Sequence, residues 1–188
     1  SGTVILSGSN SYTGSTKVGA GTLRVSSTNS VPSNNTLVSS GGTYNVNSSV
    51  ELAGLSGSGG ISISSGRTLT LNNSSMGSFS GIISGSGGFT KNGSGSFTLL
   101  NNNTYTGATT ISGGELTAKG LLGNTNISLD SGTILGFDAG DDTVGSISGS
   151  GYIDIPSGTT ITSSASSGST TFSGDLGGDG NFIKDGNY

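Results

Sequence analysis

The sequence predicts an all-β protein that winds as a right-handed parallel β-helix, in a single elongated repeat domain. Apolar residues recur in i, i+2 pairs such as Ile61 with Ile63, which places both side chains on one face of a strand. Turns rich in Gly, Ser and Asn separate these strands at intervals of about eight to ten residues. The same order of motifs also recurs along the chain. Strands this short cannot each cover a core in a two-layer sandwich, whereas a coil stacks each strand on its counterpart in the next turn.

The tandem repeat has a period of 93 residues. Tyr12 recurs as Tyr105, and Lys91 recurs as Lys184. We therefore expect a first unit at residues 1–93, a second unit, continuous with the first, at 94–186, and the start of a further unit at 187–188. The chain begins within a motif and ends as another opens, so we expect it to be part of a longer protein. A turn of three short strands and their corners needs about 20 to 30 residues, so each unit is predicted to hold about four turns.

The expected strands follow one another in chain order, each bounded by turn residues. In the first unit they lie at residues 2–6, 16–18, 21–25, 36–38, 43–46, 50–52, 60–63, 68–71, 76–83 and 88–91. A looser section around Pro32 interrupts the series, and proline suits a turn there. The second unit repeats the pattern with small slips, because residues 55–63 are matched by 147–155 at an offset of 92. No segment shows the 3.6-residue period of a helix.

The apolar member of each alternating pair is predicted to point into the coil. Burial of one such aliphatic side chain contributes roughly 1.5 to 3 kcal/mol. Thr and Ser between them are expected to face outward, where the β-branched Thr favours an extended backbone. The predicted inward residues are Ile61, Ile63, Leu69, Leu71, Leu99, Leu116, Ile127, Leu129, Ile153 and Ile155.

Composition excludes several classes of function. The 188 residues include 37 Gly, no Cys and no His, so a Ser-His-Asp triad, a cysteine nucleophile and an ordinary zinc site are impossible within this chain. A formal charge of −4 argues against nucleic acid as a partner. No apolar stretch is long enough to cross a bilayer, so no direct membrane insertion is expected of this segment.

The charge is unevenly divided between the two units. Residues 1–93 carry four basic side chains and one acidic side chain, whereas residues 94–186 carry two basic and nine acidic side chains. This asymmetry could assist end-to-end association of the chain with itself, by weak attraction that salt would screen.

Two motif blocks carry a resemblance to a known family. Residues 88–99 read GFTKNGSGSFTL, and residues 103–116 read NTYTGATTISGGEL. They resemble the autotransporter-associated β-strand repeat, also called the passenger-associated transport repeat. Phe89 and Phe97 replace the usual Leu, and Asn101 replaces a usual Gly. The resemblance implies a right-handed β-helix in the passenger of a Gram-negative surface protein, with no conserved catalytic residue.

Two other features offer candidate sites. Asp138, Asp141 and Asp142 supply oxygen ligands on a short loop and are weak candidates for Ca²⁺, although an acidic turn is the favoured interpretation. Tyr12 and Tyr105, at corners that contain Asn, could bind a glycan, although a structural role is favoured. The neighbouring Asn101–103 residues are expected to tolerate a positive φ and to bond to their own backbone. No cofactor and no catalytic residue is predicted.

The predicted function is that of a non-enzymatic extracellular stalk in an autotransporter-type protein, which supports adhesion or display and folding during secretion. It would lie at the cell surface, anchored through regions outside this chain, or be secreted. The alternative is a self-associating extracellular fibre or biofilm component, and a third possibility is an enzyme like a polysaccharide lyase. Expected partners are a second copy of the chain, or glycans or proteins on host or neighbouring cells.

Overall fold

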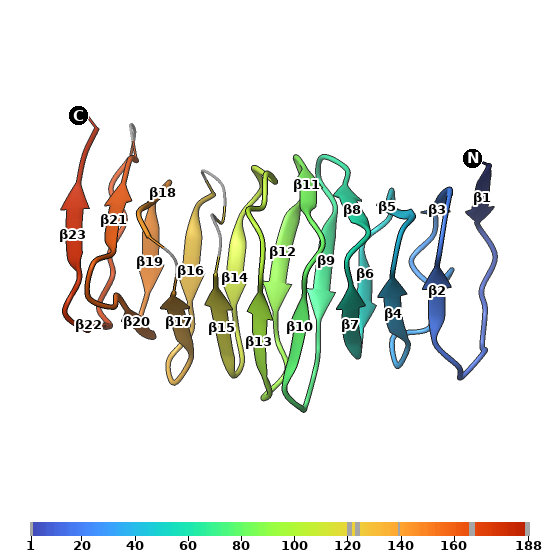
Figure 1. Cartoon of the computed structure of the whole chain (residues 1–188), viewed down its shortest axis with the longest axis horizontal. Helices are drawn as coiled ribbons and strands as arrows, with labels where there is room; N and C mark the ends of the chain where they lie inside the picture. Colours follow the sequence, from blue (N-terminus) through green and yellow to red (C-terminus); the bar gives the residue numbers. More distant parts are fainter. Residues whose placement is uncertain (1, 120–121, 123–124, 139, 166–167, 187–188) are drawn as a thin grey trace.

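A computed structural model describes residues 2–119, 122, 125–138, 140–165 and 168–186. It shows an all-β parallel solenoid of about nine turns, with the strands stacked along the long axis (Figure 1). All strand pairs among the described residues are parallel. The predicted fold class is therefore confirmed, and the right-handed sense of the coil stays a prediction.

The solenoid has three faces, which the chain visits in the order I, II, III. Face I contains β2 (Thr16–Val18), β4 (Thr36–Ser39), β7 (Gly54–Gly57), β10 (Gly77–Phe79), β13 (Ser96–Leu99), β15 (Glu115–Ala118), β17 (Ile134–Phe137), β20 (Tyr152–Asp154) and β22 (Asp175–Gly177). Face II contains β1 (Thr3–Leu6), β3 (Thr22–Val25), β5 (Thr43–Val46), β8 (Gly60–Ile63), β11 (Ile83–Gly85), β18 (Asp142–Val144), β21 (Thr160–Ser163) and β23 (Asn181–Lys184). Face III contains β6 (Val50–Leu52), β9 (Thr68–Leu71), β12 (Gly88–Lys91), β14 (Thr109–Ile111), β16 (Ile127–Leu129) and β19 (Ile147–Gly149).

Some turns cross a face without a regular strand. On face II, the backbone N–H groups of Thr104 and Thr106 donate to the carbonyls of Ile83 and Gly85, so this segment stacks on β11. On face III, the N–H of Asn10 donates to the carbonyl of Asn29 at 3.0 Å. The stacking of the coil therefore continues through these irregular segments.

The interior is a continuous ladder of apolar side chains. All ten predicted inward residues are buried, none of them with more than 3% of its surface exposed. Thr70 and Thr98, which alternate with inward residues on β9 and β13, point outward. The strand register places Leu69 against Phe89 and Phe97 against Leu116 in successive turns. The prediction of the core from the i, i+2 pattern is confirmed.

A repeated glycine motif turns the chain from one face to the next. Gly57, Gly85, Gly149 and Gly178 all have φ between +90° and +103°, in the left-handed region that favours glycine. A Cβ atom at any of them would lie 2.0 to 2.2 Å from a carbonyl oxygen of the preceding turn. The motif is thus specific to a corner, where two backbones come close together.

One predicted strand is wrong in extent. Residues 76–83 do not form a single strand, because β10 ends at Phe79 and the chain turns before β11 begins at Ile83. Gly81 lies in this corner, where an added Cβ would approach the carbonyl oxygen of Gly59 to 1.9 Å. Glycine permits this close backbone approach at the turn, which the apolar pattern alone did not reveal.

The 93-residue period does not contain a whole number of turns. Successive turns are offset by 17 residues (Thr43 with Gly60) to 23 residues (Ile153 with Leu176). From β1 to β12 the chain passes through twelve strands and two irregular segments, 8–12 and 26–31, and so crosses a face fourteen times. At three faces per turn, this is four and two-thirds turns. Equivalent strands of the two units therefore lie on different faces: β1 is on face II and β13 is on face I.

No break in strand stacking separates residues 1–93 from 94–186, since β10 on one side pairs with β13 on the other. The unit boundaries stay a prediction, and residues 187–188 lie outside the described residues. None of the described residues forms a helix long and apolar enough to cross a membrane.

Candidate functional site

The three carboxylates predicted as weak Ca²⁺ ligands have different partners. Asp138 pairs with Lys119 at 2.6 Å, and both side chains are about half exposed. Asp141 accepts a hydrogen bond from the backbone N–H of Thr160 at 2.8 Å, in the next turn. Two of the carboxylates are thus engaged separately on the surface.

Asp142 is buried, and its carboxylate is held by backbone hydrogen bonds. Its side chain accepts the backbone N–H groups of Leu122 at 2.9 Å and Thr143 at 2.8 Å. Burial raises the pKa of Asp142, and these two hydrogen bonds partly oppose the shift. Within the described ranges, no three acidic, His or Cys side chains form a group that could hold a metal ion. Calcium binding at this turn stays an untested prediction.

The two corner tyrosines differ in exposure. Tyr105 is fully buried, and its hydroxyl lies 2.6 Å from the Thr109 hydroxyl. Its ring contacts that of Phe89, with centroids 6.4 Å apart. Tyr12 makes the equivalent contact with Thr16 at 2.7 Å but is 37% exposed. The buried ring of Tyr105 leaves no surface for a glycan, so its role in this structure is to fill the interior and fix the corner.

Corner asparagines act through their side chains. The Oδ1 atom of Asn103 accepts the backbone N–H of Ile83 at 2.9 Å in the preceding turn, and its Nδ2 donates to the carbonyl of Asn101 at 2.8 Å. The corner asparagines do not adopt the positive φ that Asn can tolerate, because every described residue with positive φ is glycine. The Asn103 side chain instead accepts the N–H group of β11 that a backbone carbonyl would accept if this turn formed a regular strand on face II.

Lys91 is an unexpected member of the interior. Its side chain is fully buried between Leu71 and Ile111 in the strand register. The ammonium group donates to the backbone carbonyls of Gly93 and, at 3.1 Å, Gly113. Burial lowers the pKa of Lys91 from 10.5 to about 8. The signal was present in the sequence, since Lys91 follows the inward Phe89 by two residues.

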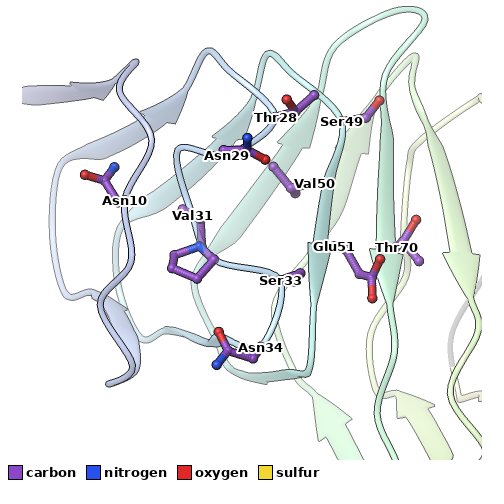
Figure 2. A pocket seen from close by; sticks show the side chains of 11 residues that line it. Asn10, Thr28, Asn29, Val31, Ser33, Asn34, Ser49, Val50, Glu51 and Thr70 are labelled. Carbon is purple, nitrogen blue, oxygen red and sulfur yellow. The ribbon is translucent and has the colours of Figure 1, made fainter.

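The surface of the described residues contains a groove on face III near the N-terminal end (Figure 2). It has a volume of about 540 Å³ and lies between residues 28–34 and the strands β6 and β9. Figure 2 shows Asn29 and Ser49 on one side, Asn34 on the other, and Glu51 beside Thr70 at the right-hand end. Its lining is Asn10, Thr28, Asn29, Val31, Pro32, Ser33, Asn34, Ser49, Val50, Glu51 and Thr70.

The groove offers neutral hydrogen-bonding groups over a small apolar floor. The exposed side chains of Asn29, Ser33 and Asn34 make no hydrogen bond within the described part of the chain. Val31 is buried beneath them. Glu51 is the only ionisable residue in the lining, and its carboxylate accepts a hydrogen bond from the Asn72 amide at 2.9 Å. Sequence reasoning recognised only a loose section around Pro32, because a groove depends on how a loop folds over neighbouring turns.

Comparisons with known proteins identify the repeat. Residues 1–25 and 89–118 match the passenger-associated-transport-repeat family. A curated relative, the adhesin BmaC autotransporter of Brucella suis biovar 1 (strain 1330), is 35% identical over 167 residues. The match covers 85% of this chain and 5% of that protein, so the chain spans a small part of its relative. No solved structure matches the chain.

The matched residues include both tyrosine corners and all but the first residue of β12, which carries Lys91. The matched strands also occupy equivalent positions in the two units, although they lie on different faces. The chain is therefore a segment of an autotransporter passenger β-helix that carries passenger-associated transport repeats and is distantly homologous to an autotransporter adhesin.

Proposed function

We propose that this segment is a non-enzymatic stalk, which holds an adhesive or other effector region of its parent protein away from the cell surface. The observation that supports this role most strongly is the stacking of about nine turns around one apolar interior, as seen in the described residues. Such a coil adds about 4.8 Å of length for each turn, and each turn is stabilised by its neighbours. The relationship to an adhesin autotransporter supports a role in adhesion.

The stalk role also fits folding during secretion. Each turn contacts mainly its neighbours, so strands can add one after another to an existing end. Lys91 and Tyr105 each bond to a later segment of the chain, through Gly113 and Thr109. These contacts would fix each corner as the next face is laid down.

Deletion of this segment from the parent protein tests the stalk role in whole cells. The expected result is unchanged export, with reduced adhesion and reduced antibody access to the distal passenger. Returning the segment to the deletion variant should restore antibody access to the distal passenger. Adhesion and access unaffected by the deletion would contradict the proposal. A screen of the purified segment for polysaccharide lyase activity in Ca²⁺ should show no cleavage.

Self-association is a second candidate. The opposite charges of the two units favour a head-to-tail arrangement of neighbouring copies. Sedimentation of the segment at low and high salt tests this candidate, which requires a concentration-dependent assembly that weakens in salt.

A further inference from the structure

A row of hydroxyl groups extends the groove along face III. The strand register places Glu51 against Thr70, and Thr70 against Thr90. It continues from Thr90 to Thr110, and then to Ser128 and Ser148. These outward side chains form one line parallel to the long axis, with about 4.8 Å between successive rungs. We call this line the hydroxyl ladder.

A second polar row runs beside the hydroxyl ladder. Its members follow the ladder residues by two positions and lie on the same side of the coil: Asn72, Asn92, Ser112, Asp130 and Ser150. No charged side chain occurs in either row between Glu51 and Asp130. The face is therefore a neutral strip of groups that can both donate and accept hydrogen bonds.

The groove and the ladder share residues and form one surface. Glu51 and Thr70 lie at the end of the groove and are also the first two rungs of the ladder (Figure 2). The groove has walls on two sides that could contact a ligand, whereas the hydroxyl ladder offers one hydrogen-bonding side chain at each turn. The combination suits a long, narrow ligand rather than a compact one.

We propose that the groove and the hydroxyl ladder together bind a neutral, extended oligosaccharide that lies along the axis of the solenoid. This inference rests on the proposed stalk role and names a partner for it. The rung spacing is close to the length of one sugar ring in an extended glycan, so successive sugars can meet successive turns. Hydroxyl and amide side chains match sugar hydroxyls in both hydrogen-bonding senses. Glu51 and Asp130 disfavour an anionic polysaccharide, and neither Lys nor Arg lines the groove.

The test uses the purified segment and neutral hexasaccharides of glucose, galactose and N-acetylglucosamine, with a heparin hexasaccharide as the anionic probe. Saturation-transfer NMR detects binding and isothermal titration measures affinity. At least one neutral hexasaccharide should bind, and more tightly than heparin. Failure of all the neutral probes to bind the folded segment, or preference for heparin, would overturn the inference.

Matched variants locate the ligand. Asn34→Ala in the groove and Thr90→Val in the ladder should each weaken binding about fivefold to tenfold, as expected for loss of one hydrogen bond. Asn45→Ala on face II and Thr98→Val on face I are the controls, since both residues also alternate with inward residues, and their affinities should stay within about twofold. Equal losses of affinity in the controls, or a loss with Asn34→Ala alone, would overturn the proposal that one ligand lies along both the groove and the hydroxyl ladder.

Melting curves of the same variants show that folding is preserved. A folded segment that binds no neutral glycan would remove this inference and leave the stalk role intact. Conversely, glycan binding by the segment, with no effect of its deletion on display by the parent protein, would remove the stalk role.

Discussion

The two copies of the tyrosine corner have nearly the same sequence but different surroundings. Tyr12 and Tyr105 each place the hydroxyl next to a Thr four residues later. Tyr105 has coil on both sides and is fully buried, whereas Tyr12 lies in the first turn and is 37% exposed. The motif therefore fixes the local turn by itself, and it contributes to the core only where turns lie above and below.

The same comparison shows that the repeat specifies corners rather than faces. The glycine motif turns the chain from face I to face II at Gly57, and from face III to face I at Gly149. Because one 93-residue unit advances the coil by four and two-thirds turns, each motif recurs on a rotated face. Three units would be needed to return it to the same side.

Removal of the tyrosine rings should give the largest difference between the copies. Tyr105→Ala is expected to lower the free energy of unfolding by roughly 3 to 5 kcal/mol, because it leaves a large cavity. Tyr12→Ala should cost less than about 1.5 kcal/mol, because its ring is partly exposed. Urea unfolding measures both. Similar losses for the two variants would show that burial does not distinguish the copies.

Alanine substitution at the corner glycines tests whether different corners are equivalent. Gly57→Ala and Gly149→Ala should each cost roughly 2 to 4 kcal/mol, because each combines a positive φ with a backbone clash. Gly66→Ala is the control. Gly66 also has a positive φ but has open space around its Cβ position, so the loss should be about 1 kcal/mol. If thermal melting shows as large a loss of stability for Gly66→Ala as for the other two variants, the close backbone approach at Gly57 and Gly149 would be contradicted.

Lys91, which is equivalent in sequence to the exposed Lys184, should make the stability of the fold depend on pH. The folded pKa of Lys91 is about 8 and its ordinary value is 10.5, so between these values the unfolded chain binds more protons. The free energy of unfolding should therefore rise from pH 8 toward pH 10. Burial also raises the pKa of Tyr44 and Tyr105, which opposes this rise above pH 10.

Denaturant titrations at pH 7, 8, 9 and 10 measure the slope. Lys91→Met should flatten it, because the titrating group is removed. Lys184→Met is the matched control, since Lys184 is exposed on β23. A slope that persists in Lys91→Met would assign the pH dependence to another group.

The smallest effect is expected at the acidic turn, which the first unit lacks. Asp138→Asn should change the free energy of unfolding by less than about 1 kcal/mol, because its ion pair with Lys119 is half exposed. Added Ca²⁺ should leave the melting temperature unchanged. A rise in melting temperature with Ca²⁺ that Asp141→Asn abolishes would instead support a calcium site.

Sequence predicted the interior well because its signal is local. Pairs such as Leu69 with Leu71 alternate with outward Thr, and this alternation decides which side chain faces the core. The three strands of each turn were also predicted, but the fractional turn count could not be predicted in the same way. The length of a turn varies, and only backbone pairing shows which strands lie on one another.

The groove and the buried lysine mark the limits of pattern reading. Lys91 occupies an inward position of an alternating strand, but its charge argued against burial until its two carbonyl partners were placed in space. The groove depends on residues 28–34, which carry no strand pattern and fold beside β6 and β9. Long-range stacking determines both features.

A distance between spin labels at Thr70 and Ser148 tests the central claim most directly. Both residues lie on the hydroxyl ladder and are separated by four turns. At about 4.8 Å per turn, the parallel solenoid predicts a narrow distribution near 19 Å. A broad distribution, or a distance centred well above this value, would contradict the in-register stacking of turns.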